Sequence, residues 1–318
     1  MMIYKKIIIN FVVITLAFIL FVVWHQFNFI KSKQTSMSLI PFYTVYLVTV
    51  DQGFRYWGIL NQGAADMAEL IGINYIWEAP EVRSTERQIE IINEAVLDGA
   101  NALLIAADDP KEISGPVEDA KARGVKVIYV DTPAYEEAIT TLATDNYEAG
   151  VIAAQTMLRN LDEAGVESGS IGIVNLADKE NTRLREVGFR EMMELDERFN
   201  LIETIYTALD RPEVTQEAAE QIIAQNPDLV GLFGTSEGTS LGVGYANRAN
   251  DKRYVTIGFD LTDVSLPLLE DGSFDALIDQ NPYTMGYLGM AEAVAAILGK
   301  ETGPEFINTG VTVVESYP

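Results

Sequence analysis

Polar side chains that can bind hydroxyl groups follow one apolar, β-branched run after another along this sequence. The residues that follow such runs are Asp51, Asp108, Asp109, Asp131, Asn175, Ser236, Glu237, Asp260, Asp279 and Gln280. If the runs are parallel strands, their carboxyl ends meet at one edge of a sheet, where open α/β folds bind ligands. Carboxylates and amides accept hydrogen bonds from hydroxyls, so this repetition indicates a polyhydroxylated ligand. For any single position, capping of the next helix is an equally good explanation.

Three aromatic residues, Phe54, Tyr56 and Trp57, stand beside the first of these runs. An aromatic ring can pack its face against the C–H face of a sugar ring while its edge remains wet. The alternative is that Trp57 belongs to the hydrophobic core.

The composition excludes several kinds of catalytic site. The chain has no cysteine, and its single histidine, His25, lies in an apolar N-terminal region. Disulfides, thiolate catalysis, cysteine-ligated metals and a Ser-His-Asp triad in the folded body are therefore excluded. The glycine-rich stretch 234–244 lacks the G-K-[ST] ending of a phosphate loop. The many carboxylates leave a glycosidase open in principle, but we expect no catalytic residue, cofactor or metal ion.

The N-terminal region has the character of a membrane segment. The segment Ile7–Trp24 contains no charged residue, and it is just long enough to span a bilayer core. A cleaved secretory signal is the alternative, but no small-x-small site closes the apolar run. We therefore expect a single-pass signal-anchor in residues 1–30, a tether over residues 31–42, and the body on the extracytoplasmic side.

The charge of the chain argues against nucleic acid as a partner. Lys and Arg number 22 against 47 Asp and Glu, which gives a net charge of −25. The first 42 residues hold four lysines and no acid, so the body carries −29. A body this acidic repels phosphate backbones.

Alternating strand and helix patterns predict an α/β body. Continuous apolar strands between helices are typical of parallel sheets covered on both faces, and the body is long enough for two such sheets. A T-x-x-Q capping box, Thr85 with Gln88, predicts the start of a helix over Thr85–Leu97. The predicted strands are Thr44–Val50, Ile73–Trp77, Ala102–Ile105, Val125–Val130, Ser170–Val174, Leu201–Tyr206, Leu229–Phe233, Tyr254–Phe259 and Asp275–Ile278.

From about Thr44 onward the chain resembles the periplasmic sugar-binding proteins of the ribose/galactose type, which share their core with LacI-type repressors. The motifs that carry the resemblance are Tyr56-Trp57 before GILNQGA, then DGANALLIAADDP, GVKVIYVDTPA, LATDNYEAG, NTRLREVGF, LVGLFGTSEGTSLG, VTIGFD and ALIDQNP. Each motif is soft alone, but they occur in the order and spacing of the family.

The resemblance implies two Rossmann-like lobes joined by a three-stranded hinge that close on a ligand. We expect residues 43–144 with 281–304 to form the N-terminal lobe, and residues 145–280 with 305–318 to form the C-terminal lobe. The ligand-binding residues that the resemblance implies are Tyr56, Trp57, Asp131, Arg183, Ser236, Asp260 and Gln280.

The chain also departs from the ribose-type pattern. Ala106, Thr132 and Ser236 stand where ribose-type members commonly have Asn, Arg and Asn. Loss of the first-lobe arginine removes a bidentate donor, so we expect a ligand other than ribose. Asp51 and Asp109, with Thr132, are expected to supply replacement contacts.

The function implied is that of an extracytoplasmic receptor that binds a sugar or sugar-like molecule and delivers it to an ABC transporter permease. The alternative is a membrane-tethered sugar sensor that presents its ligand state to a sensor histidine kinase. A LacI-type repressor would need a DNA-binding element and a basic surface, so we exclude it.

Overall fold

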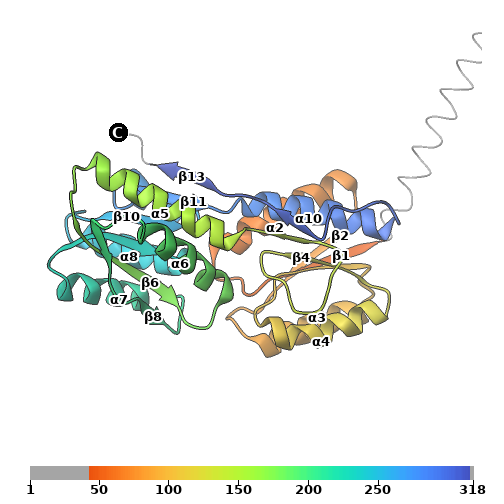
Figure 1. Ribbon diagram of the computed structural model, residues 1–318. Coiled ribbons are helices and arrows are strands. Elements are labelled where there is room, and N and C mark those ends of the chain that lie inside the picture. Colours follow the sequence, from red (N-terminus) through yellow and green to blue (C-terminus); the bar gives the residue numbers. More distant parts are fainter. Residues whose placement is uncertain (1–42, 316–318) are drawn as a thin grey trace, which may run out of the picture.

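The computed structural model describes residues 43–315, which fold into two lobes lying side by side (Figure 1). Each lobe is a sheet with helices on both faces, as the strand–helix alternation predicts. Within the described residues no helix is long and apolar enough to cross a membrane. The expected anchor and tether, residues 1–42, lie outside the described part of the chain.

The first lobe is built on a six-stranded parallel sheet of order β12-β5-β4-β3-β1-β2. Strand β1, next to the edge strand β2, alternates between two cores: Val45 and Leu47 face α2 and α10, while Tyr46 and Val48 face α3 and α4. The elements are β1 (Thr44–Val48), α2 (Arg55–Ile71), β2 (Asn74–Glu78), α3 (Thr85–Leu97), β3 (Ala102–Ile105), α4 (Pro110–Ala122), β4 (Lys126–Val130), β5 (Thr141–Ala143), α10 (Pro282–Ile297) and β12 (Phe306–Asn308).

The second lobe repeats this architecture on a sheet of order β13-β11-β10-β9-β6-β7, in which β8 also pairs with β6 and only β13 is antiparallel. One core lies under α5 and α6, and the other under α7, α8 and α9. The elements are α5 (Asn146–Glu163), β6 (Gly169–Leu176), α6 (Glu180–Met193), β7 (Phe199–Leu201), β8 (Ile205–Thr207), α7 (Pro212–Gln225), β9 (Leu229–Gly234), α8 (Glu237–Ala249), β10 (Val255–Phe259), α9 (Leu266–Glu270), β11 (Ala276–Asp279) and β13 (Thr312–Glu315).

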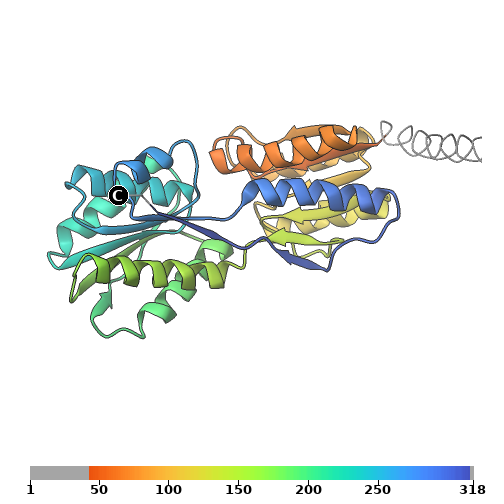
Figure 2. The same ribbon diagram turned by 90° about the horizontal axis from the view of Figure 1, so that it is seen from above.

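Three segments cross between the lobes, as expected for a hinge (Figure 2). They follow β5, β11 and β12, so neither lobe is a continuous stretch of chain. Strand β12 pairs with β5 in the first sheet, with Ile307 opposite Leu142. The C-terminal boundary expected at residue 305 therefore lies too early, because residues 306–308 belong to the first lobe.

In each lobe a helix that follows a crossing packs closely against a neighbouring helix, α10 against α2 and α5 against α6. A Cβ placed on Gly63 of α2 would lie 2.0 Å from the carbonyl oxygen of Tyr283 in α10. In the second lobe, a Cβ on Gly188 of α6 would lie 2.1 Å from the carbonyl oxygen of Tyr147 in α5. Only glycine allows the two backbones of each pair to approach this closely.

One predicted local feature is wrong. The N-cap of α3 is Ser84, whose Oγ accepts a hydrogen bond from the backbone N–H of Arg87, rather than Thr85. Thr85 instead donates to Asp108 (2.7 Å), and Gln88 is buried and donates to the carbonyl oxygens of Thr49 and Ala106. The capping-box residues therefore tie α3 to the ends of β1 and β3.

Candidate functional site

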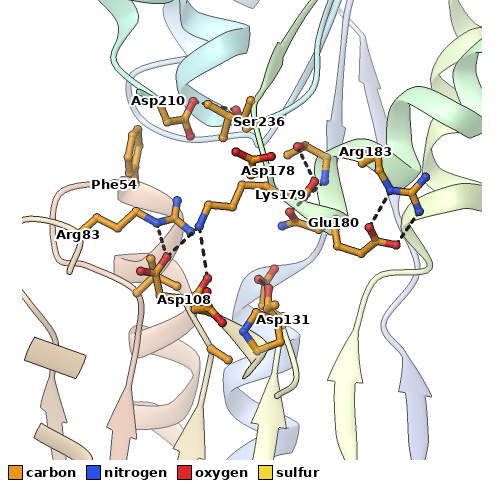
Figure 3. Close-up of a pocket in the computed structure, with 18 of the residues that line it drawn as sticks. Phe54, Arg83, Asp108, Asp131, Asp178, Lys179, Glu180, Arg183, Asp210 and Ser236 are labelled. Carbon is orange, nitrogen blue, oxygen red and sulfur yellow. Dashed lines mark hydrogen bonds and ion pairs between the residues drawn. The ribbon is translucent and has the colours of Figure 1, made fainter. Parts of the chain in front are cut away.

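A cavity of about 910 Å³ lies between the lobes, where the carboxyl ends of both sheets face each other. This is the size of a site for a small molecule. The side chains around it come from both lobes (Figure 3). All ten residues predicted for the site line it: Asp51, Tyr56, Trp57, Asp109, Asp131, Thr132, Arg183, Ser236, Asp260 and Gln280.

The first lobe presents two carboxylates at the ends of β1 and β4. Asp51 Oδ1 accepts hydrogen bonds from the backbone N–H groups of Gly53 (2.7 Å) and Phe54 (3.2 Å). Burial raises the pKa of Asp51, although these two N–H donors partly offset the effect. Asp131 accepts from the Tyr56 hydroxyl (2.7 Å) and from Thr132 Oγ1 (2.5 Å).

The aromatic residues have two kinds of environment. Tyr56 and Trp57 are both buried in the core under α2 and α10, and their rings meet edge to face with centroids 4.9 Å apart. Trp57 is only 8% exposed, yet it still borders the cavity. Phe54 is less buried and lies at the cavity wall (Figure 3). Trp57 therefore belongs both to the hydrophobic core and to the wall of the cavity.

Arg185, which the sequence analysis did not select, forms the base of the second-lobe wall. It is 2% exposed and donates to Asn146 Oδ1 (2.8 Å), to the carbonyl oxygen of Thr235 (2.8 Å) and to Gln280. Its guanidinium lies 4.3 Å from the centre of the Phe259 ring. It is therefore a rigidly held cation at the cavity.

Arg183, the arginine that the resemblance implies, is placed differently. It borders the cavity but is exposed, and its guanidinium is paired with Glu180 one turn earlier (2.6 Å; Figure 3). Since α6 advances by about 100° per residue, Arg183 and Arg185 leave the helix in nearly opposite directions. The sequence RLR gave no means of choosing between them.

The second lobe also carries an acidic group around Arg185 and Ser236. Gln280 Nε2 donates to Asp260 (2.6 Å), and Ser236 Oγ donates to Asp210 (2.8 Å). Burial raises the pKa of Asp260 to about 7, although Arg185 opposes the rise. Burial also raises the pKa of Asp210 to about 6.

Two predicted residues also act as helix caps. Asp109 Oδ1 accepts from the backbone N–H groups of Lys111 (2.9 Å) and Glu112 (3.0 Å) at the start of α4. Ser236 caps α8 in a reciprocal capping box with Thr239. The capping explanation that the sequence left open thus holds for both, alongside their position on the cavity wall.

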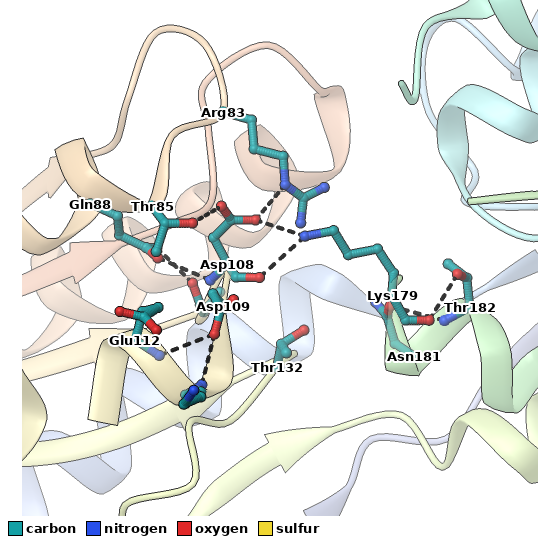
Figure 4. Close-up of polar contacts among 12 residues, drawn as sticks. Arg83, Thr85, Gln88, Asp108, Asp109, Glu112, Thr132, Lys179, Asn181 and Thr182 are labelled. Atoms are coloured by element: carbon teal, nitrogen blue, oxygen red, sulfur yellow. Dashed lines mark hydrogen bonds and ion pairs between the residues drawn. The ribbon is translucent and has the colours of Figure 1, made fainter. Parts of the chain in front are cut away.

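A second unselected group centres on Asp108 at the end of β3 (Figure 4). Its carboxylate accepts from Arg83, from Thr85 and from Lys179 Nζ (3.1 Å), and Lys179 belongs to the second lobe. Burial raises the pKa of Asp108, but the charges of Arg83 and Lys179 and the Thr85 hydrogen bond outweigh it, so the net shift is downward. Asp108 is therefore an ionised carboxylate.

Three residues that line the cavity have a left-handed backbone. They are Asp131, Asp178 and Asp260, with φ of 66°, 58° and 71°. Such conformations cost about 1 kcal/mol or more for a residue with a side chain, and they concentrate at functional sites. Each of the three directly follows or closely follows a strand, so the strain serves to turn a carboxylate at the sheet edge.

This arrangement suits the binding of a hydroxylated molecule. Carboxylates, an amide, an arginine and aromatic rings face one cavity, which offers acceptors, donors and an apolar surface together. Within residues 43–315 no cluster of three or more His, Cys, Asp or Glu side chains is arranged to hold a metal ion. Fold and site together define a two-lobed receptor for small ligands.

The chain belongs to the periplasmic binding protein family, because the profile of the periplasmic binding protein domain matches residues 45–301. It is 26% identical over 273 residues to the xylose/arabinose-binding protein of Sulfolobus acidocaldarius, which covers 77% of this chain and 66% of that protein. It is 27% identical over 218 residues to the ribose import binding protein of Bacillus subtilis, over 68% of this chain and 70% of that protein.

Among solved structures, a carbohydrate transporter solute-binding protein from Agrobacterium radiobacter in complex with D-arabinose superposes with a TM-score of 0.79. The two chains are 26% identical, and the match covers 86% of this chain and 94% of that one. These relatives are sugar-binding transport proteins and not enzymes.

Proposed function

We propose that this protein is an extracytoplasmic receptor that binds a sugar between its lobes and delivers it to an ABC transporter. The observation that carries the proposal is the polar cavity at the facing strand ends, with Asp131 and Asp260 on opposite lobes. The sugar-binding transport proteins that the chain resembles support the same function. None of these relatives supports the alternative of a sensor that signals to a histidine kinase.

In the proposed complex, Asp51 and Asp131 accept hydrogen bonds from hydroxyls on the first-lobe side, assisted by Thr132 and Asp109. Asp260, Gln280 and Ser236 do so on the second-lobe side. Arg185 donates to Gln280, which in turn donates to Asp260, and the charge of Arg185 favours the ionised form of Asp260. The aromatic wall of Phe54, Tyr56 and Trp57 covers one face of the ring. Arg183 can reach the ligand only if it leaves Glu180.

The ligand is proposed to differ from ribose. Thr132 stands on the first-lobe wall where ribose-type members commonly have Arg, and Asp51, Asp109 and Asp131 are carboxylates on the same wall. Such a wall favours a molecule rich in hydroxyl donors, such as another pentose or a hexose.

The test is calorimetric titration of the full chain, purified in detergent, with D-xylose, L-arabinose, D-arabinose, D-ribose, D-glucose and D-galactose. We expect saturable one-to-one binding of at least one sugar, recovered chemically unchanged. Asp131→Asn should weaken that binding by about tenfold or more, since it removes a charge-assisted acceptor. Asp162→Asn is the control, because Asp162 lies on the surface in an ion pair with Arg198. Binding of none of these sugars, or conversion of one, would contradict the proposal.

We also propose that Ile7–Trp24 remains attached and holds the receptor at the membrane. The support is the sequence alone, through its uncharged length and the lack of a cleavage site. Membrane fractionation and N-terminal sequencing of the mature chain test it. A soluble chain that begins after Ser38 would show that the segment is a cleaved signal.

A further inference from the structure

Helix α2 begins without a cap from its own lobe. Its N-cap residue, Phe54, makes no side-chain hydrogen bond to the first turn, and that turn holds no acidic residue. The first backbone N–H groups of a helix have no partner within the helix, and this end carries a partial positive charge. The first turn of α2 therefore needs an acceptor from elsewhere.

The second lobe supplies that acceptor. Glu237, the first residue of α8, accepts a hydrogen bond at Oε2 from the backbone N–H of Tyr56 (3.1 Å). Glu237 is 5% exposed and borders the cavity. Its carboxyl group thus takes the place of an N-cap for a helix in the other lobe, and separating the lobes must break the contact.

Burying an acid in this place is costly for the second lobe itself. Glu237 lies close enough to Asp260 and Asp210 for their charges to destabilise its ionised form. Glu237 stands at the start of its own helix α8, and the start of α2 across the cleft attracts the same carboxyl group. The contact between lobes offsets part of the cost of burying this acid.

Lys179 makes a second contact across the cleft. Its Nζ donates to Asp108 Oδ1 (3.1 Å) and to the Asp108 carbonyl oxygen (3.3 Å). Asp108 is held within the first lobe by Arg83 and Thr85, and its backbone N–H donates to the buried Gln88 (Figure 4). A third contact, Arg55 with Asp263 (3.3 Å), is exposed on both sides and is therefore expected to contribute little.

We propose that Glu237 is a positioning residue that couples closure of the lobes to the ordering of the first turn of α2, with Lys179 as a second latch. That turn and its N-cap carry Phe54, Tyr56 and Trp57, the aromatic wall of the cavity. Closure therefore completes the helix start that holds the wall in place. The role in sugar binding rests on the proposed function, but the latch itself is made by protein groups alone.

The latch is tested by measuring the separation of the lobes. The chain has no cysteine, so spin labels on Val82→Cys and Leu209→Cys attach only at these two sites. Both positions are exposed, and they adjoin Arg83 and Asp210 on opposite walls of the cavity. Distance distributions are recorded by pulsed electron spin resonance on the full chain in detergent, first without added sugar.

We expect Glu237→Ala to reduce the ratio of short to long separations by about tenfold, as for the loss of one buried hydrogen bond. Glu237→Asp should behave in the same way, because its carboxylate is one methylene too short to reach α2. Glu237→Gln should retain the short separations, since its amide oxygen can still accept. Lys179→Met should shift the ratio in the same direction as Glu237→Ala, and the control Asp263→Asn should leave it unchanged.

Equal distributions for Glu237→Ala and the parent protein would overturn the proposal, as would equal losses in Glu237→Ala and Glu237→Gln. If Glu237→Ala is unfolded by circular dichroism, the comparison of Glu237→Asp with Glu237→Gln decides. The measurement needs no sugar, so it stands even if the titration of sugars fails. If sugars bind but the variants leave the separations unchanged, the latch is wrong and the proposed function remains.

Discussion

Trp57 belongs at once to the core of the first lobe and to the wall of the cavity, whereas Phe54 belongs mainly to the wall. Truncating a buried Trp leaves a large void, so we expect Trp57→Ala to lower the free energy of unfolding by about 3–5 kcal/mol. Phe54→Ala should lower the free energy of unfolding clearly less than Trp57→Ala does, but the two variants should weaken sugar binding to a similar extent. Chemical denaturation and titration of the same two variants separate the two effects.

The outcome that would contradict this assignment is a reversed order. If Phe54→Ala unfolds more readily than Trp57→Ala, then Phe54 is the core residue and the aromatic wall is wrongly described. Unchanged sugar binding in both variants would remove this wall from the site.

Glu237 should make stability depend on pH. The pKa of Glu237 is raised to about 8, mainly by burial and then by the charges of Asp260 and Asp210. The backbone N–H groups of Tyr56 and Arg55 act in the opposite direction and lower the pKa. A raised carboxyl pKa means that the folded protein binds more protons than the unfolded chain between the two pKa values. Stability therefore falls as the pH rises from the unfolded value, about 4.3, toward 8, and levels off above it.

The measurement is the melting temperature of the parent protein and of Glu237→Gln across this pH range. We expect the parent protein to lose stability with rising pH, and the variant to show a flatter profile because it cannot titrate. Identical profiles would show that Glu237 keeps the same pKa in the folded and unfolded chain.

Individual site residues could be predicted only where they directly follow a strand that the sequence shows. Asp131, Asp260 and Gln280 follow strands that the sequence shows clearly, and all three line the cavity. Arg185 could not be chosen over Arg183, because helix rotation and not residue type separates them. Glu237 also follows a predicted strand, but its contact with α2 could not be recognised, since its partner lies across the cleft and far away in the sequence.

Among the helices, the close pairing of α2 with α10 gives a direct prediction. Gly63→Ala places a Cβ 2.0 Å from the Tyr283 carbonyl oxygen, so the two backbones must separate. We expect a loss of about 1–3 kcal/mol in the free energy of unfolding, the usual cost of overpacking. Chemical denaturation at equilibrium measures it.

Gly58 in the same helix is the matched control, because a Cβ there meets nothing within 4 Å. Gly58→Ala should stabilise the protein by about 0.5–1 kcal/mol through helix propensity alone. A Gly63→Ala variant as stable as Gly58→Ala would show that α2 and α10 can move apart freely.

The sequence predicted most of the strands and missed three short ones. Every predicted strand corresponds to an observed one, although Leu201–Tyr206 is divided between β7 and β8, which pair with successive parts of β6. Strands β5, β12 and β13 were not predicted, because they lack the run of three or more apolar residues that marks the similarly short β3 and β11. Their places are set by pairing with neighbouring strands, and they determine where the chain crosses between lobes.

For the whole molecule, the charge of −29 on the body predicts no affinity for nucleic acid. At physiological salt we expect the purified full chain to leave the electrophoretic mobility of duplex DNA unchanged. A shift that weakens as salt is added would instead reveal a basic surface that the overall charge conceals.

The division of each lobe into separate stretches of chain also has a consequence for synthesis. Met285, Met290 and Ala293 of α10 belong to the first-lobe core, so this core stays incomplete while the ribosome makes the whole of the second lobe up to β11. The second lobe then lacks only its edge strand β13. Domains commonly fold in the order of their synthesis. Here the first lobe is completed only after the body of the second lobe. A chain that stops near residue 281 would leave one face of its first sheet covered by α2 without α10.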